Sequence, residues 1–400
     1  MRLIRGPLAG AHDADVCVVG GGMTGAAAAL DLARRHRRVV LLEAAAVGAG
    51  ASGANLGHVA VGLGCHYSTA IAELGAQGAL EVWETHRENH ELLKERLAEL
   101  KQPCGYEARG GFALALDREE ATALAESEDL LRADTFSGEF FDHYMLEARF
   151  DVRGFAGAYW SADDGEIDSP AFVAALAEAA EAAGVTIFEG SPVRALARGP
   201  RGVRAETAAG TVDAEVAIVA LDAYAPSLVP FLAERIRPLR GQCLALATEI
   251  PLTIPSPAYA GRGRVYWRVR GDRLVIGGFD DLAFTEESTV EPGTTAVIQQ
   301  AIEAFAREHF LGAVGPVIDR WSGIMGISLD GFPFVGAVPG EPLIAAAGFT
   351  GLGFGYALLA ARWAAELAAT GHDPTPARYR AARPFTPGPW PPWSPHVETP

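Results

Sequence analysis

The sequence predicts an α/β protein in which a parallel sheet is combined with a second, mainly antiparallel sheet. Near the N-terminus, two apolar runs of strand length, 16–19 and 39–42, enclose an Ala- and Leu-rich stretch of helix length. Between residues 236 and 279, by contrast, short strands follow one another without a helix between them. Strand and helix return after residue 343, so the parallel part is predicted to be assembled from separated stretches of the chain.

The first stretch, residues 15–43, has the pattern of a unit that binds an ADP-containing dinucleotide. Its first strand enters the sequence Gly20-x-Gly22-x-x-Gly25, and its second strand ends at Glu43. Gly20 permits a tight turn, Gly22 lets the backbone approach a pyrophosphate, and Gly25 allows the helix to pack closely on the strand. The pyrophosphate would bind at the helix N-terminus, and the carboxylate of Glu43 would accept hydrogen bonds from the ribose hydroxyls. A Rossmann-like domain that disfavours a ribose 2′-phosphate is therefore predicted.

The remaining elements are predicted from hydrophobic periodicity and turn residues. In chain order they are a Gly- and Ala-rich loop over 47–64, a helix over 67–99, a strand within 106–116, a helix ending near 132, a helix over 171–183 with Ser169 as its N-cap, strands over 185–189, 214–220, 242–247, 265–269 and 274–278, a helix over 294–310, a strand over 343–347 and a helix ending near 369. The last 27 residues contain nine prolines. Residues 373–400 are therefore predicted to form a surface arm or mobile tail.

Composition excludes several classes of protein. The 400 residues carry a formal net charge of −17, which argues against nucleic acid and anionic membrane surfaces as partners. No run of 18 or more uncharged apolar residues and no apolar signal core occur, so a cytoplasmic protein without an integral membrane span is predicted. The four cysteines are scattered without a CxxC pair, which favours reduced thiols over disulfides or a metal site.

Further motifs follow the opening unit in a fixed order: the loop 50–57, Asp164-Gly165 with the helix after it, the strand 216–220, the segment 321–336 and the turn 348–353. In this order they resemble the D-amino-acid oxidase superfamily of flavoproteins, which includes glycine oxidase, sarcosine oxidase, D-amino-acid dehydrogenase and the gamma-glutamylputrescine oxidoreductases. The resemblance covers about residues 14–370. It implies a discontinuous FAD-binding domain, residues 1–100, 150–235 and 320–372, and a substrate domain made of residues 101–149 and 236–319. The cysteine that tethers FAD in sarcosine oxidases is missing near Gly323, so noncovalent FAD is expected.

The resemblance also implies which residues bind FAD. They are Gly20, Gly22, Met23, Thr24, Gly25, Glu43, Ser52, Asn55, Leu56, Gly57, Val193, Ala220, Gly348, Phe349, Thr350, Gly351, Leu352 and Gly353. Val193 would lie at the adenine and the turn 348–353 at the flavin ring. A glycine-rich turn that leads into a long helix directs free N–H groups and a positive dipole end outward, which would stabilise an anionic reduced flavin. A tight packing turn without this role is the alternative.

The reaction implied by the resemblance is oxidation of the C–N bond of an amine, or of an N-substituted or D-amino acid, to an imine by hydride transfer to flavin N5. Neither lysine of the chain, Lys94 or Lys101, lies in the strand 274–278, where sarcosine oxidases carry a lysine that promotes reaction with oxygen. The electron acceptor, oxygen or another compound, is thus left open. Whether the protein forms a homo-oligomer is also left open. A flavin-binding subunit with an assembly or electron-relay role is an alternative. An NAD-dependent dehydrogenase is a further one, but it does not account for the turn 348–353.

The candidates for the catalytic end of the site are His58, Arg268, Tyr266 and Met325. Glycine and D-amino-acid oxidases place a carboxylate-binding arginine in the segment aligned to 321–330, and here Met325 occupies that position. Arg268 or Arg270 on a neighbouring strand is the predicted replacement, unless these are surface charges. His58 is expected either to steer the amine or to be a hydrogen-bonded structural histidine. Aromatic residues expected either in an apolar pocket or in the core are Tyr266, Trp267, Trp321, Phe349 and Tyr356.

Overall fold

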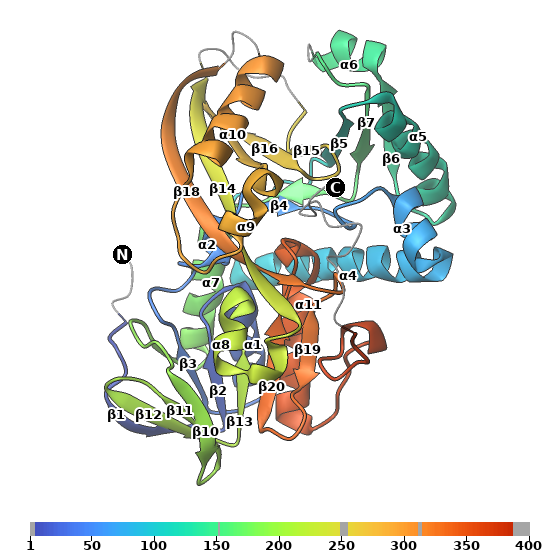
Figure 1. Ribbon diagram of the computed structural model, residues 1–400. Coiled ribbons are helices and arrows are strands. Elements are labelled where there is room, and N and C mark those ends of the chain that lie inside the picture. The colour runs from blue at the N-terminus through green and yellow to red at the C-terminus, as the bar shows by residue number, and fades with distance from the viewer. Residues whose placement is uncertain (1–4, 151–152, 249–254, 311–313, 387–400) are drawn as a thin grey trace.

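The computed structural model describes residues 5–150, 153–248, 255–310 and 314–386. Two sheets occupy opposite halves of the molecule, and the long helix α4 (Ala76–Leu100) lies across the region between them (Figure 1). Within the described ranges no helix is long and apolar enough to cross a membrane.

The parallel sheet occupies the lower half of Figure 1. Its strands, in spatial order, are β19 (Phe334–Ala337), β20 (Leu343–Ala347), β13 (Val216–Val219), β2 (Val16–Val19), β3 (Val39–Leu42) and β9 (Thr186–Phe188). Neighbours from β20 to β9 run parallel, and β19 is an antiparallel edge strand. Because three of these strands come from the first 190 residues and three from beyond residue 215, the sheet is discontinuous in sequence as predicted.

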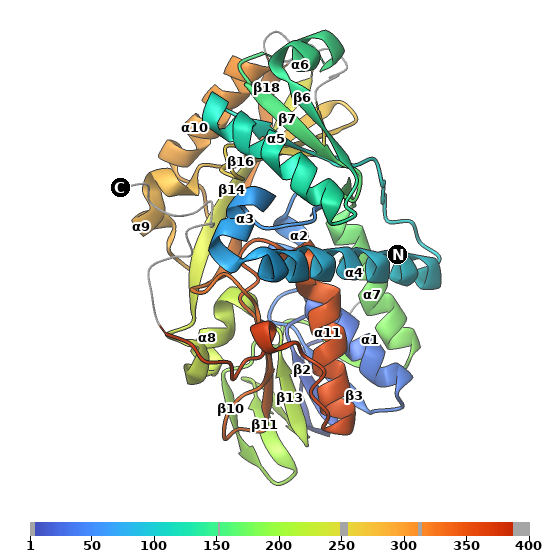
Figure 2. The same cartoon turned by 90° about the vertical axis from the view of Figure 1, so that its right-hand side faces the viewer.

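Both faces of the parallel sheet are covered, which explains its continuous apolar runs. Val16 and Val18 of β2 face one core, whereas Cys17 and Val19 face the other. The helices on the first face are α1 (Met23–Arg34), α7 (Ser169–Ala182) and α11 (Gly353–Thr370), and Figure 2 shows them side by side. A smaller sheet covers the second face, with the order β1 (Gly10–Asp13), β12 (Gly210–Ala214), β11 (Gly202–Glu206) and β10 (Ala195–Gly199).

The large sheet forms the upper half of the molecule. Its order is β18 (Val314–Ser328), β14 (Ile236–Thr248), β17 (Arg273–Gly278), β16 (Val265–Arg270), β15 (Ala258–Ala260), β5 (Gly111–Ala115), β7 (Gly157–Ser161) and β6 (Gly138–Asp142). Apart from the parallel pair β15 and β5, neighbours are antiparallel. The predicted fold class, α/β with a mainly antiparallel second sheet, is confirmed.

One face of the large sheet packs on α10 (Ala296–His309), so the opposite face is left for a ligand. Leu244 of β14 and Trp267 of β16 are buried in the core beneath α10. Since side chains alternate along a strand, Cys243 and Tyr266 point to the opposite face. That face is directed toward the parallel sheet, and the cavity described below lies there.

The shorter elements differ in places from the prediction. They are α2 (Ala51–Ala54), α3 (Tyr67–Leu74), α5 (Arg118–Ala133), α6 (His143–Phe150), α8 (Ala225–Leu228), α9 (Phe284–Glu287) and the strand pair β4 (His58–Val59) and β8 (Gly165–Glu166). The single helix predicted over 67–99 breaks at Gly75, whose φ of +73° is unfavourable for other residues. The N-cap of α7 is Asp168 and not Ser169, because the Asp168 carboxylate accepts the N–H of Ala171 at 3.2 Å.

Residues 373–386, within the predicted surface arm or mobile tail, are anchored to the rest of the molecule. Tyr379 is fully buried, and its ring stacks on Trp363 with a centroid separation of 5.7 Å. Arg383 forms an ion pair with Asp330 at 2.7 Å. Residues 387–400 lie outside the described residues. The domain boundaries stay a prediction, although β7, assigned from the sequence to the FAD-binding segment 150–235, pairs in the large sheet.

Candidate cofactor and substrate site

A continuous cavity of about 750 Å³ is lined by residues from both sheets. Its wall includes Glu43 and Val193, the turn after β2, and also His58, Tyr266 and Met325. Its volume lies within the range of about 300–1,000 Å³ typical of ligand pockets. The cavity therefore connects the nucleotide-binding stretch predicted near the N-terminus with the predicted substrate end.

The glycine turn after β2 leaves no room for side chains. A Cβ on Gly25 would lie 1.9 Å from the carbonyl oxygen of Gly20, so only glycine lets α1 pack this closely on β2. A Cβ on Gly20, which has a φ of +110°, would lie 2.4 Å from the carbonyl oxygen of Ala220. Gly22 is the N-cap of α1 and supplies no capping side chain. The positive end of the helix thus faces a bare backbone cradle, which fits a pyrophosphate.

Glu43 follows β3 and is held by backbone groups. Its Oε2 accepts the N–H of Gly21 at 2.7 Å, and its Oε1 accepts the N–H of Ala45 at 2.9 Å. Each carboxylate oxygen keeps a further lone pair. Because Glu43 lies on the cavity wall beside Val193, these lone pairs suit two adjacent hydroxyls of a ribose. Its role as the ribose-binding acid stays a prediction.

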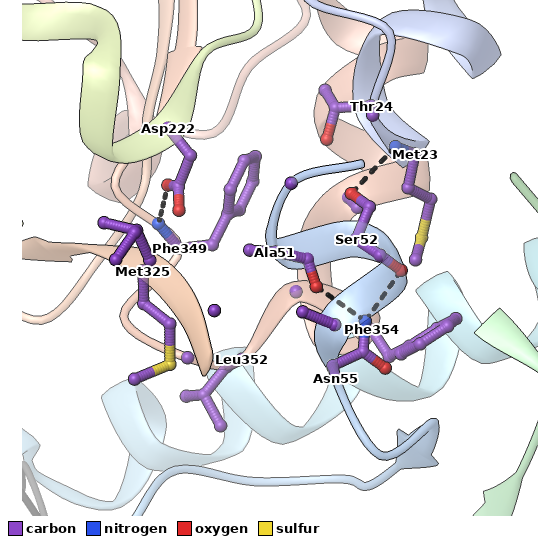
Figure 3. A pocket seen from close by; sticks show the side chains of 18 of the residues that line it. Met23, Thr24, Ala51, Ser52, Asn55, Asp222, Met325, Phe349, Leu352 and Phe354 are labelled. Carbon is purple, nitrogen blue, oxygen red and sulfur yellow. Dashed lines mark hydrogen bonds between the residues drawn. The ribbon is translucent and has the colours of Figure 1, made fainter. Parts of the chain in front are cut away.

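The loop that contains α2 is fixed against the start of α1 by its own polar side chains (Figure 3). Ser52 Oγ accepts the N–H of Met23 at 3.0 Å. Asn55 Nδ2 donates to the carbonyls of Ala51 and Ser52 at 3.0 and 2.9 Å, and Asn55 Oδ1 accepts the N–H of Gly57 at 2.7 Å. The side chain of Asn55 therefore shapes the cavity wall.

The turn that follows β20 forms another part of the wall. Its residues from Phe349 to Gly353 line the cavity, whereas Gly348 and also Gly25 lie behind the lining residues. Gly353 begins α11, and the N-cap Leu352 supplies no side-chain cap. In the described part of the chain the N–H groups of Gly351 and Gly353 have no protein partner. The helix α11 thus presents free donors and a positive dipole end to the cavity.

His58 is the polar side chain at the substrate end. Its Nε2 donates to the carbonyl of Trp267 at 2.9 Å, which leaves Nδ1 as a hydrogen-bond acceptor. Burial, together with the Arg268 guanidinium, lowers the pKa of His58 to about 4, so the ring is neutral at neutral pH. The ring of Tyr266 lies edge-on to it at 6.3 Å. Both side chains line the cavity.

The structure brings neither of the expected arginines to the cavity. Arg268 is buried and donates to the carbonyl of Ile167 at 2.7 Å, behind Gly57. Arg270 is exposed and pairs with Asp168. The expectation that one of them replaces the carboxylate clamp is thereby corrected. Alternation along β16 does turn Arg268 to the same face as Tyr266, but it lies beyond the end of the cavity.

Apolar groups and small residues form most of the substrate end. Met325 lies on the wall near Phe349 and Leu352 (Figure 3). Of the five aromatic candidates, Tyr266 and Phe349 line the cavity. The other three belong to the packing: Trp267 lies under α10, Trp321 donates to the carbonyl of Ala54 at 2.8 Å, and Tyr356 is fully buried.

In the described part of the chain, the wall carries negative but no positive side-chain charge. Among the described residues that line the cavity, the carboxylates are Glu43 and Asp222, and none is lysine or arginine. In the same described ranges, no group of His, Cys, Asp or Glu is arranged to hold a metal ion, and the four cysteines are buried and free. Asp222 was not predicted as a site residue from the sequence. A polar residue three positions after a parallel strand, at its carboxyl end, was the available signal.

His86, which supports the cavity wall from behind, was also not predicted from the sequence. It is fully buried on α4, and its Nδ1 accepts the N–H of Gly62 at 3.1 Å. Gly62 belongs to the loop 60–64, which lines the cavity. A Cβ on Gly355 would lie 2.5 Å from the His86 ring, so this histidine also fixes the first turn of α11. No local sequence signal marks it.

A doubly covered parallel sheet with a glycine turn, joined by one cavity to an antiparallel sheet, is the arrangement of a dinucleotide-binding protein with a separate substrate region. Residues 15–367 match the model of the DAO family, described as FAD dependent oxidoreductase, and the chain belongs to this family. The expected family and FAD as cofactor are thereby confirmed. Noncovalent attachment stays a prediction.

Relatives of known activity are similar over most of their length. The chain is 28% identical to the glycine oxidase of Geobacillus kaustophilus over 352 residues, which are 82% of this chain and 85% of the relative. It is also 28% identical to the gamma-glutamylputrescine oxidoreductase of Escherichia coli over 363 residues, 88% of this chain and 83% of the relative. The crystal structure of glycine oxidase from Geobacillus kaustophilus superposes with a TM-score of 0.78 at 25% identity, covering 94% of this chain and 100% of that one.

Proposed function

We propose that this FAD-dependent oxidoreductase oxidises the C–N bond of an amine whose reacting carbon carries no carboxylate. When bound, FAD supplies the two-electron acceptor for cleavage of the C–H bond next to nitrogen. The observation that supports this substrate class is the absence of lysine and arginine among the described residues of the cavity wall. A substrate carboxylate enclosed there without a cationic partner would carry a large desolvation cost.

The chain's own residues have distinct parts in this proposal. The acceptor Nδ1 of His58 would bind an N–H of the neutral amine and orient the carbon next to it. Met325, Cys243 and Tyr266 would pack against the carbon skeleton and exclude water. The free N–H groups of Gly351 and Gly353 would favour negative charge on a cofactor bound against this turn.

The names of the relatives leave the choice between amine and amino acid open. One is named for glycine, and the other for gamma-glutamylputrescine, which has a free putrescine amine as well as the α-amino acid group of its glutamyl part. Met325 in place of a carboxylate clamp supports the amine, because a thioether offers a carboxylate neither charge nor hydrogen-bond donors.

The test is a set of substrate pairs that differ only by the α-carboxylate: putrescine with ornithine, methylamine with glycine, and dimethylamine with sarcosine. Flavin bleaching is followed anaerobically, and air is then admitted to see whether oxygen restores the colour. We expect the amine of at least one pair to reduce the flavin more than about tenfold faster than its carboxylated partner. Faster reduction by every carboxylated partner would refute the proposed substrate class. No reduction by any compound would favour an electron-relay subunit.

A further inference from the structure

Asp222 lies where three segments of the cavity wall meet. It follows β13 and begins a short 3₁₀ turn, Asp222–Tyr224. Its φ of +45° is a left-handed conformation that aspartate and asparagine tolerate better than most residues. Its side chain lines the cavity, and Figure 3 shows it directed at the backbone of Phe349.

The carboxylate of Asp222 accepts hydrogen bonds from two distant segments. Oδ1 accepts the N–H groups of Gly348 and Phe349 at 2.8 and 3.1 Å, and Oδ2 accepts the N–H of Gly326 at 2.7 Å. A Cβ on Gly326 would lie 2.6 Å from Oδ1, so the approach of β18 to this carboxylate requires glycine. One side chain thus joins the end of β13, the end of β18 and the turn before α11.

These bonds decide which N–H groups of the turn stay free. Gly348 and Phe349 donate to Asp222, and Thr350 donates to the carbonyl of Gly326 at 2.9 Å. The donors left over in the described structure are those of Gly351 and Gly353, on the cavity wall. Thr350 itself has a left-handed φ of +54°, a conformation that surrounding contacts must hold. Without Asp222, two more N–H groups would lack a partner and the turn would lose its anchor.

The charge of Asp222 is a second way in which this residue can affect a bound cofactor. Three N–H donors are best satisfied by an ionised carboxylate, whereas burial raises the pKa of Asp222 above its ordinary value of 3.8. The three N–H donors favour the ionised form, in which Asp222 places a negative charge on the same wall as the positive end of α11. Such a charge opposes the extra electron density of a reduced cofactor nearby.

We propose that Asp222 is a positioning residue for FAD: its carboxylate fixes the turn 348–353 in the form that presents Gly351 and Gly353, and its charge lowers the reduction potential of the bound cofactor. The proposal depends on FAD as cofactor and not on the proposed amine substrate. Failure of the substrate experiment therefore leaves it intact.

Two substitutions separate the charge from the shape of the turn. In Asp222→Asn, the amide oxygen can still accept from Gly348 and Phe349, but the charge is lost and the N–H of Gly326 faces an amide donor in place of Oδ2. In Asp222→Gly, the positive φ is kept without strain and all three bonds are lost. The matched control is Asp213→Asn, which removes a carboxylate paired with Arg204 on the small sheet, away from the cavity.

The holoenzymes are compared by midpoint potential, measured by equilibration with reference dyes, and by the rate at which flavin fluorescence appears after dilution. We expect a more positive potential in D222N and about tenfold faster flavin release in D222G, with neither change in D213N. An unchanged potential in D222N or an unchanged release rate in D222G overturns the proposal. If D222G yields no holoenzyme, the potential of D222N decides: a more positive value supports the proposal, and an unchanged or more negative value overturns it.

Discussion

At the scale of single residues, the polarity of the substrate end depends on His58. Its Nε2–H is used by the carbonyl of Trp267, so a fixed tautomer presents Nδ1 as an acceptor. An imidazolium would offer only donors there and would repel a protonated amine. A low pKa thus suits a residue that selects the neutral form of an amine.

Replacing His58 by alanine is expected to lower kcat/KM for the best amine by roughly 10- to 100-fold, because one hydrogen bond to the reacting nitrogen is lost. Since the pKa of His58 is about 4, its ring stays neutral from pH 6 to 9 and adds no inflection to the kcat/KM profile in that range. The rise with pH should follow deprotonation of the substrate. Stopped-flow flavin reduction across this range measures both quantities.

The exposed His143, outside the cavity, provides the control substitution His143→Ala. An inflection near pH 6 to 7 that is present in the wild type and disappears in H58A would show that His58 titrates. In that case its assignment as a neutral acceptor would be wrong.

Asp164 gives a residue-scale prediction about stability. It is buried, and its Oδ1 accepts the N–H of Val61 and the hydroxyl of Ser161, both at 2.9 Å. Burial raises the pKa of Asp164 from 3.8 to about 7. The folded protein therefore holds a proton that the unfolded chain releases, so the contribution of Asp164 to stability is complete below pH 4 and is lost as the pH rises through 7.

Asp164→Asn should remove this dependence. We expect D164N to equal the wild type near pH 4 and to be more stable at pH 8, by at most about 4 kcal/mol for the change from 3.8 to about 7. Denaturant unfolding at both pH values measures the difference. Asp129→Asn, at an exposed carboxylate, is the control and should shift stability by less than about 1 kcal/mol at either pH. A stability difference that grows toward pH 4 would contradict the assignment.

At the scale of elements, the site depends on how closely α1 packs on β2. A methyl group on Gly25 would meet the Gly20 carbonyl at 1.9 Å, and backbone cannot give way as a flexible side chain can. Gly25→Ala should therefore displace the N-terminus of α1, with loss of bound flavin and a fall in stability of roughly 1–3 kcal/mol.

The flavin-to-protein absorbance ratio and thermal unfolding measure the two effects of Gly25→Ala. Arg34→Ala in the last turn of the same helix is the control, because its ion pair with Glu99 is exposed and contributes little. Full flavin content in G25A would show that the helix can move without disturbing the cradle.

The elements that the sequence predicts well are those whose signal is local. The stretch 15–43 combines strand, glycine turn, helix and terminal acid within 30 residues, and the structure has each in place. Asp222 could not be assigned in this way, because its partners Gly326 and Phe349 lie 104 and 127 residues away. The expectation for Arg268 was wrong for a related reason. Alternation along the strand gives the face on which its side chain lies, but the place where the cavity ends is set by packing with the loop at Gly57, which is distant in the sequence.

At the scale of the whole molecule, charge should govern the approach of the substrate. The chain has a formal net charge of −17, and the described wall of the cavity adds carboxylates without cations. A field of this sign concentrates cations near the entrance and speeds their encounter, and salt screens it over a Debye length of about 10 Å at 0.1 M. The effect grows with substrate charge, so a diamine should respond more strongly than a monoamine of equal length.

We therefore expect kcat/KM for putrescine to fall several-fold between about 0.01 M and 0.2 M salt, and that for butylamine to fall less. Initial rates over a salt series with one buffer measure both. Because the two compounds share a four-carbon chain and one reacting amine, their ratio cancels effects of salt on the cofactor or on folding. A ratio that is constant, or that rises with salt, would show that the protein's field does not act on the substrate, and substrate selection would then have to come from contacts inside the cavity alone.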